Sequence, residues 1–142
     1  MGQVKADASG PEAQRRTRPL SPHLQVWRWH VTMAASIFTR ATGVALYVGL
    51  FVVVAWAASL ASGPDAYELF MGLMASWLGK LVLFGLTVSI FYHLAAGLRH
   101  LAFDSGVGFE PKTANMTAIV CMAFGVVATL AVWALAFAVG AI

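Results

Sequence analysis

The sequence predicts an all-α integral membrane protein with three transmembrane helices. Only 11% of its 142 residues are charged while 60% are hydrophobic, and the mean hydropathy is +0.77. Soluble domains carry about 25% charged residues, so a soluble domain of this composition could not cover its surface with polar groups. The composition also excludes a disordered chain and a multidomain enzyme, and the single cysteine, Cys121, excludes a disulfide scaffold.

Three uncharged runs indicate where the chain crosses the bilayer. Residues 41–64, 81–98 and 113–142 contain no Asp, Glu, Lys or Arg. A helix needs roughly 20 apolar residues to cross about 30 Å of hydrocarbon, so each run predicts one crossing. Lys80 and Arg99 lie 19 residues apart, which is roughly 28 Å along a helix. Their side chains can therefore reach opposite interfaces of the second span.

From these runs we expect helices over about 34–61, 67–104 and 113–139. The second helix would include an extension that lies in or beyond the outer interface. Residues 1–18 are expected to form a disordered cytoplasmic segment, and residues 19–142 to form one three-span membrane domain.

The charges also predict the orientation in the membrane. Residues 1–40 carry a net charge of +4, whereas the first loop contains Asp65 and Glu68 and no basic residue. The second loop is flanked by Arg99 and Lys112. The positive-inside rule places the N-terminus and the second loop in the cytoplasm. Because an adjoining span explains the basic segment, we expect no nucleic-acid partner.

One face of the second span carries residues that could bind a ligand. Gly85, Ser89, His93 and Gly97 recur every four residues, and His100 follows three residues later, so all five share a face. Small residues at this spacing allow the close approach of another helix or of a flat ligand. The pattern fits either a hydrogen-bonded histidine at a helix contact or a histidine that binds a ligand.

The depth of His93 favours a functional site. It lies six residues inside Arg99, roughly 9 Å along the helix, and an ionisable group inside the bilayer is costly unless it has a partner. The chain has four histidines and no intramembrane carboxylate, which disfavours a proton relay or a cation transporter. Zinc needs three or four nearby ligands, whereas haem iron takes axial ligands on opposite faces of a flat ring.

A haem ligated by His93 would need its second ligand from elsewhere. His100 lies about 10 Å farther along the same helix, so the two side chains cannot sandwich one iron. The opposing ligand would then belong to another subunit. The haem propionates would lie toward the cytoplasmic face, near Arg40, Arg99 and His100.

A second candidate site lies at the cytoplasmic edge of the first span. Ser36 and Arg40 are four residues apart and share a face. Their hydroxyl and guanidinium could donate hydrogen bonds to a carbonyl of a lipid-soluble ring. On spacing alone, the arginine could equally anchor the helix to phosphate headgroups, with Ser36 incidental.

Three sequence motifs, taken in their order along the chain, resemble those of a known family. They are Arg18–Gln25 (RPLSPHLQ), Ser36–Gly43 (SIFTRATG) and His93–Asp104 (HLAAGLRHLAFD). Together with three spans, they resemble the cytochrome b556 membrane-anchor subunits of succinate dehydrogenase, the succinate:quinone oxidoreductase of the respiratory chain. The resemblance covers the chain from about Arg18 to its end. One departure is Thr39, where many members of the family carry histidine.

The resemblance implies a role for each candidate residue. His93 would be an axial ligand of haem b, and Ser36 and Arg40 would line the ubiquinone site. Arg40 would also lie near a haem propionate. The anchor would lie in the cytoplasmic membrane of a bacterium or in the mitochondrial inner membrane, with its N-terminus on the cytoplasmic or matrix side.

The resemblance also implies partners. A flavoprotein subunit and an iron–sulfur subunit would pass electrons from succinate through FAD and iron–sulfur clusters. A second anchor subunit would complete the helix bundle and supply the other haem histidine. The chain has no flavin motif and no cysteine pattern for clusters, so it would not oxidise succinate alone. The alternatives are an anchor of a quinol:fumarate reductase and a non-redox membrane scaffold or small transporter.

Overall fold

The computed structural model describes residues 27–140, and all of its regular structure is helical. The helices are α2 (Val31–Ser62), α3 (Pro64–Ala75), α4 (Trp77–Asp104) and α5 (Pro111–Ala138). Of these, α2, α4 and α5 are long and apolar enough to cross a membrane. The prediction of an all-α protein with three spans is therefore confirmed. The segment 1–18 and the first motif lie outside the described residues.

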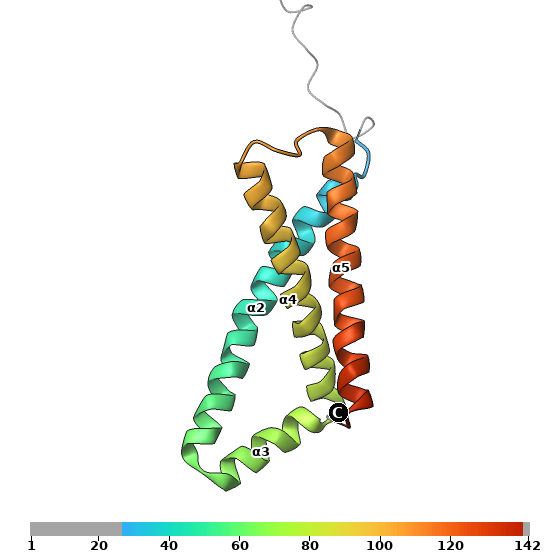
Figure 1. Cartoon of the computed structure of the whole chain (residues 1–142). Coiled ribbons are helices and arrows are strands. Elements are labelled where there is room, and N and C mark those ends of the chain that lie inside the picture. The colour runs from blue at the N-terminus through green and yellow to red at the C-terminus, as the bar shows by residue number, and fades with distance from the viewer. Residues whose placement is uncertain (1–26, 141–142) are drawn as a thin grey trace, which may run out of the picture.

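The three long helices are packed through α4, which contacts both of the others. Figure 1 shows α2 crossing α4 near the end at which α2 begins and then diverging from it toward α3. The beginning of α2, the end of α4 and the beginning of α5 lie at the same end of the molecule (Figure 1). We call this the α4–α5 loop end. The short helix α3 runs across the opposite end.

The extension expected at the start of the second span is instead a separate helix. The chain breaks at Ser76, whose backbone is extended (φ −63°, ψ 159°) and whose hydroxyl accepts a hydrogen bond from the Gly79 amide. This is N-capping, which satisfies an amide that a new helix leaves unpaired. A Cβ atom at Gly79 would also collide with the backbone of Met74. Helix α3 therefore ends at Ala75, and α4 begins at Trp77.

Small residues allow the helices to approach closely. Gly125 of α5 faces Tyr92 of α4, and a Cβ atom at Gly125 would lie 2.9 Å from the Tyr92 Cβ. Tyr92, Ala96 and Cys121 form the buried cluster between these helices. At the other contact, Gly49 of α2 packs against the side chain of Leu86. Inside a bilayer such close packing replaces the hydrophobic effect as the force that joins helices.

Hydrogen bonds between side chains add to this packing. The Tyr92 hydroxyl donates to the Ala35 carbonyl oxygen at 2.8 Å and joins α4 to α2. The Trp133 indole N–H donates to the Thr87 hydroxyl at 3.3 Å and joins α5 to α4. Most large apolar side chains are exposed in the isolated chain, as expected for helices that face lipid or other subunits.

The glycine contacts predict a specific effect on stability. We expect Gly125→Ala to destabilise the protein relative to Gly72→Ala, because the new methyl group meets the Tyr92 backbone at Gly125 but nothing within 4 Å at Gly72. Both substitutions raise the helix propensity by the same amount. The difference between their effects on the free energy of unfolding therefore isolates the clash, which should cost about 1–3 kcal/mol. Thermal unfolding of the purified, detergent-solubilised complex would measure it. Equal midpoints for the two variants would contradict the assigned contact.

Candidate functional site

A cavity with several polar side chains in its wall, which we call the polar cavity, lies at the α4–α5 loop end. Its volume is about 450 Å³, and Ser36, Thr39 and Arg40 of α2 and Arg99 and His100 of α4 contribute to its wall. Ser36 and Arg40 share the cavity because they are one helical turn apart. Residues separated by some sixty positions in the sequence therefore border the same space. The structure brings together both groups of residues that were predicted separately, those for a quinone and those for haem propionates.

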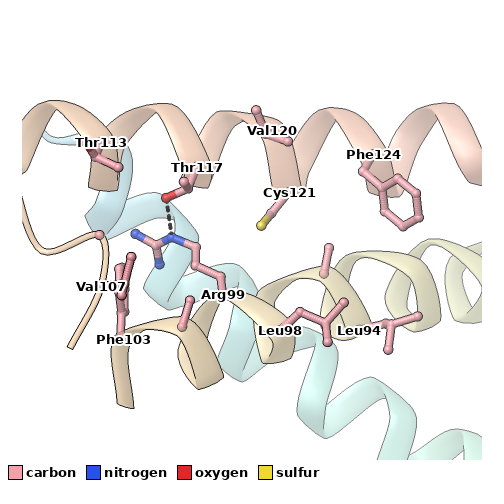
Figure 2. Close-up of a pocket in the computed structure, with 13 residues that line it drawn as sticks. Leu94, Leu98, Arg99, Phe103, Val107, Thr113, Thr117, Val120, Cys121 and Phe124 are labelled. Carbon is pink, nitrogen blue, oxygen red and sulfur yellow. Dashed lines mark hydrogen bonds between the residues drawn. The ribbon is translucent and has the colours of Figure 1, made fainter. Parts of the chain in front are cut away.

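Arg99 has hydrogen-bond partners on α5 that the sequence did not predict. Its Nε donates to the Thr117 hydroxyl at 2.9 Å, and its Nη2 donates to the Ala114 carbonyl oxygen at 2.9 Å. The guanidinium carbon also lies 4.4 Å from the centre of the Phe103 ring, in a cation–π contact. Figure 2 shows the side chain pointing from α4 toward Thr117 of α5. Arg99 thus joins the end of α4 to the beginning of α5.

A second cavity, of about 530 Å³, lies between α4 and α5 next to Arg99. Its wall is mainly apolar and includes Leu94, Leu98, Val120 and Phe124 (Figure 2). An apolar surface of this kind can bind lipid tails or a neighbouring helix, but it does not offer a set of groups for proton or metal chemistry. The polar cavity is therefore the better candidate for a reacting ligand.

His93 lies deeper than the polar cavity and faces α2. Its Nδ1 lies 3.1 Å from the Thr42 hydroxyl oxygen, and its ring lies against Gly43, where a Cβ atom would be 3.3 Å from the His93 Cε1. The residue is partly buried. Within residues 27–140, no hydrogen bond engages the His93 Nε2.

The surroundings of His93 fit the binding of one face of a haem. Gly97, one turn farther along α4, has nothing within 4 Å of the position that a Cβ atom would occupy. A flat ring could occupy this open space on the face of α4 that also carries His93, and a neutral imidazole binds a metal through the ring nitrogen that carries no hydrogen. Over the described part of the chain, no three or more His, Cys, Asp or Glu residues gather into a metal site. The donor set is a single imidazole, as required of one axial ligand.

The predicted small-residue face of α4 does not pack as a unit. Ser89 is buried and its hydroxyl donates to the Gly85 carbonyl oxygen at 2.8 Å. Gly85 and Gly97 instead border open space. The close approach to α2 at His93 is made by Gly43, the last residue of the second motif. Sequence reasoning missed this role, although the motif itself contained the residue.

Thr39 also points into the protein. Its hydroxyl donates to the Ala35 carbonyl oxygen at 2.8 Å and lies 3.3 Å from the Tyr92 hydroxyl. Thr39 therefore contacts α4 and lies in the wall of the polar cavity. This is the position that departs from the resemblance described above. Tyr92 was not predicted as part of this region, because a tyrosine in an apolar span gives no local sign of its partner.

Comparisons with known proteins identify the family. Residues 14–132 match the family described as "Succinate dehydrogenase/Fumarate reductase transmembrane subunit". The succinate dehydrogenase cytochrome b556 subunit of Paracoccus denitrificans is 40% identical over 116 residues, which cover 82% of this chain and 89% of that protein.

Two cytochrome b560 subunits are also similar to this chain. The cytochrome b560 subunit of Reclinomonas americana is 32% identical over 121 residues, with 82% of this chain and 84% of that protein covered. The mitochondrial cytochrome b560 subunit of Sus scrofa is 32% identical over 118 residues, with 80% and 68% covered. With its three apolar helices and a family match over most of its length, this chain belongs to the family of succinate dehydrogenase and fumarate reductase transmembrane subunits.

Proposed function

We propose that the chain is the haem b-binding membrane anchor subunit of a succinate dehydrogenase and that it helps form the site at which ubiquinone is reduced. The observation that carries this proposal is the polar cavity, whose wall includes Ser36 and Arg40 of α2 and His100 of α4. The cytochrome names of the relatives support a haem.

Ser36 and Arg40 would bind the quinone through one of its carbonyl groups. Both side chains can donate hydrogen bonds, and both lie at the wall of a cavity large enough for a quinone ring. Negative charge develops on the quinone oxygens as electrons arrive. A guanidinium placed there favours the reduced forms, because hydrogen bonds from charged donors strengthen as the acceptor becomes negative.

His93 would hold the haem through Nε2, with Arg40 and His100 near its propionates. A bound haem supplies a centre that accepts and releases single electrons. The role of this chain is to bind and orient the group: the imidazole donates a lone pair, and the space at Gly97 admits the ring edge. The opposing axial histidine would come from the second anchor subunit.

The proposed complex contains a flavoprotein subunit, an iron–sulfur subunit and a second membrane anchor. It would lie in the cytoplasmic membrane of a bacterium or the mitochondrial inner membrane, since relatives come from both settings. The family description also includes fumarate reductase, which leaves a quinol:fumarate reductase anchor as the second candidate. The names of the relatives favour succinate dehydrogenase.

The quinone site can be tested with Ser36→Ala and Arg40→Leu. Loss of a hydrogen bond from a charged donor should cost about 1.5–3 kcal/mol, so we expect quinone reduction by the Arg40 variant to fall by roughly one to two orders of magnitude. Succinate oxidation with a soluble dye should persist, because the dye takes electrons before they reach the membrane. Steady-state assays of both reactions on assembled complexes measure this.

Two further variants separate quinone binding from headgroup anchoring. Ser59→Ala removes from the same helix a hydroxyl that donates to the Trp56 carbonyl oxygen, and it should leave quinone reduction unchanged. Arg40→Lys keeps the charge that an anchor needs but loses the planar donor set. If Ser36→Ala behaved like Ser59→Ala and Arg40→Lys kept full quinone turnover, Arg40 would be a headgroup anchor.

The haem site can be tested with His93→Ala and His100→Ala. We expect His93→Ala to alter or abolish the low-spin b-type spectrum, because it removes an axial ligand, and His100→Ala to shift the signal only modestly. Optical spectra and low-temperature EPR of assembled complexes distinguish the two. A normal low-spin signal in His93→Ala combined with its loss in His100→Ala would show that the other histidine is the ligand.

The proposed topology places the N-terminus and the loop after Asp104 in the cytoplasm or matrix. Single cysteines at Ser9, Ser62 and Ser105, introduced after replacement of Cys121, would report the side on which each lies. We expect an impermeant thiol reagent added from outside to label only the cysteine at position 62, which lies at the opposite end of α2 from its beginning. Labelling of positions 9 and 105 instead would show that the chain has the opposite topology.

A further inference from the structure

The contact between His93 and Thr42 determines more than the position of the ring. The Thr42 hydroxyl oxygen lies 3.1 Å from the His93 Nδ1. The same hydroxyl donates to the Phe38 carbonyl oxygen at 2.7 Å, with the Thr39 carbonyl oxygen also within reach at 3.2 Å. Three potential partners therefore surround a single hydroxyl group.

The hydrogen count assigns the direction of each bond. A threonine hydroxyl has one hydrogen and two lone pairs. The Phe38 carbonyl oxygen can only accept, and its 2.7 Å bond is the shortest of the three contacts, so we assign the hydroxyl hydrogen to this bond. The Thr42 oxygen is then an acceptor toward His93, and the hydrogen of the 3.1 Å contact belongs to Nδ1. A neutral imidazole with its hydrogen on Nδ1 has its free lone pair on Nε2.

We propose that Thr42 is a positioning residue for His93: it accepts the Nδ1 hydrogen, holds the tautomer that presents Nε2, and fixes the rotation of the ring. The inference rests on the proposed function, in which His93 binds haem iron. It assigns the iron-binding atom to Nε2 and identifies the residue that makes this atom available.

Gly43 completes the arrangement. A Cβ atom at this position would lie 3.3 Å from the His93 Cε1, which is closer than an ordinary contact, and 3.9 Å from Nδ1. A glycine next to Thr42 therefore lets the imidazole approach α2 closely enough to bond to the hydroxyl. Thr42 and Gly43 act on the same ring, one through a hydrogen bond and the other by leaving space.

This arrangement has an electronic consequence. A hydrogen bond accepted from the N–H of a metal-binding imidazole raises the basicity of the ring and tunes the metal. A more basic axial ligand stabilises ferric over ferrous haem. Loss of the Thr42 hydroxyl should therefore shift the haem midpoint potential in the positive direction and change the EPR g values, since the ring also becomes free to rotate.

The test compares Thr42→Val, which keeps the branched shape, with Thr42→Ser, which keeps the hydroxyl. In purified complexes that retain haem, we expect a positive shift of the midpoint potential and altered g values in Thr42→Val, and wild-type values in Thr42→Ser. Thr87→Val is the matched control, because it removes from α4 a threonine hydroxyl that donates to the Leu83 carbonyl oxygen and accepts from the Trp133 indole. Optical redox titration and low-temperature EPR provide the readouts, and neither depends on quinone turnover.

The outcomes separate this inference from the proposed function. Wild-type potential and g values in Thr42→Val would overturn the role of Thr42 even if His93→Ala loses the normal haem spectrum. A normal spectrum in His93→Ala would overturn both proposals. If Thr42→Val does not assemble, Thr42→Ala takes its place with the same expected shift. Gly43→Ala, which keeps the hydroxyl but displaces the ring, should also change the g values, and unchanged values would remove the role of Gly43.

Discussion

The crossing of α2 over α4 is the contact on which the polar end of this molecule depends. Lipid is as apolar as the helices, so close packing and hydrogen bonds, rather than the hydrophobic effect, hold them together. Gly49 packs against Leu86, and Gly43 packs against His93. The Tyr92 hydroxyl adds a bond to the first turns of α2. Because these contacts extend from Ala35 to Gly49 of α2, the polar residues near the beginning of α2 are held next to the end of α4.

The adjacent pair Arg99 and His100 shows how one helix serves two purposes. Successive residues point in directions about 100° apart around a helix. Both residues border the polar cavity, but Arg99 bonds to Thr117 and Ala114 of α5, while His100 is exposed. A partly buried guanidinium is costly without partners, and α5 supplies them. The arginine that resembled a site residue in the sequence thus makes a structural bond that supports the wall of the site.

Much of the fold could be predicted from local sequence. Length and hydropathy identify a span because every residue in hydrocarbon meets the same solvent, so the three crossings did not depend on knowing their neighbours. The four-residue spacing of Ser36 and Arg40 placed them on one face, and they do border one cavity. The break at Ser76 was not predicted, because serine capping depends on a backbone bend that composition does not reveal.

The sequence by itself determined the number of spans, the depth of His93 and the set of polar residues at one end of the molecule. Only the tertiary structure decided which helix faces meet: Gly97 borders open space, whereas Gly43 contacts the imidazole, and Thr42 and Tyr92 join α2 to α4. The physical reason is that a membrane helix is apolar on every side. Hydrophobic periodicity therefore does not mark its protein-facing side, and that side is selected by the shape and hydrogen bonds of residues distant in the chain.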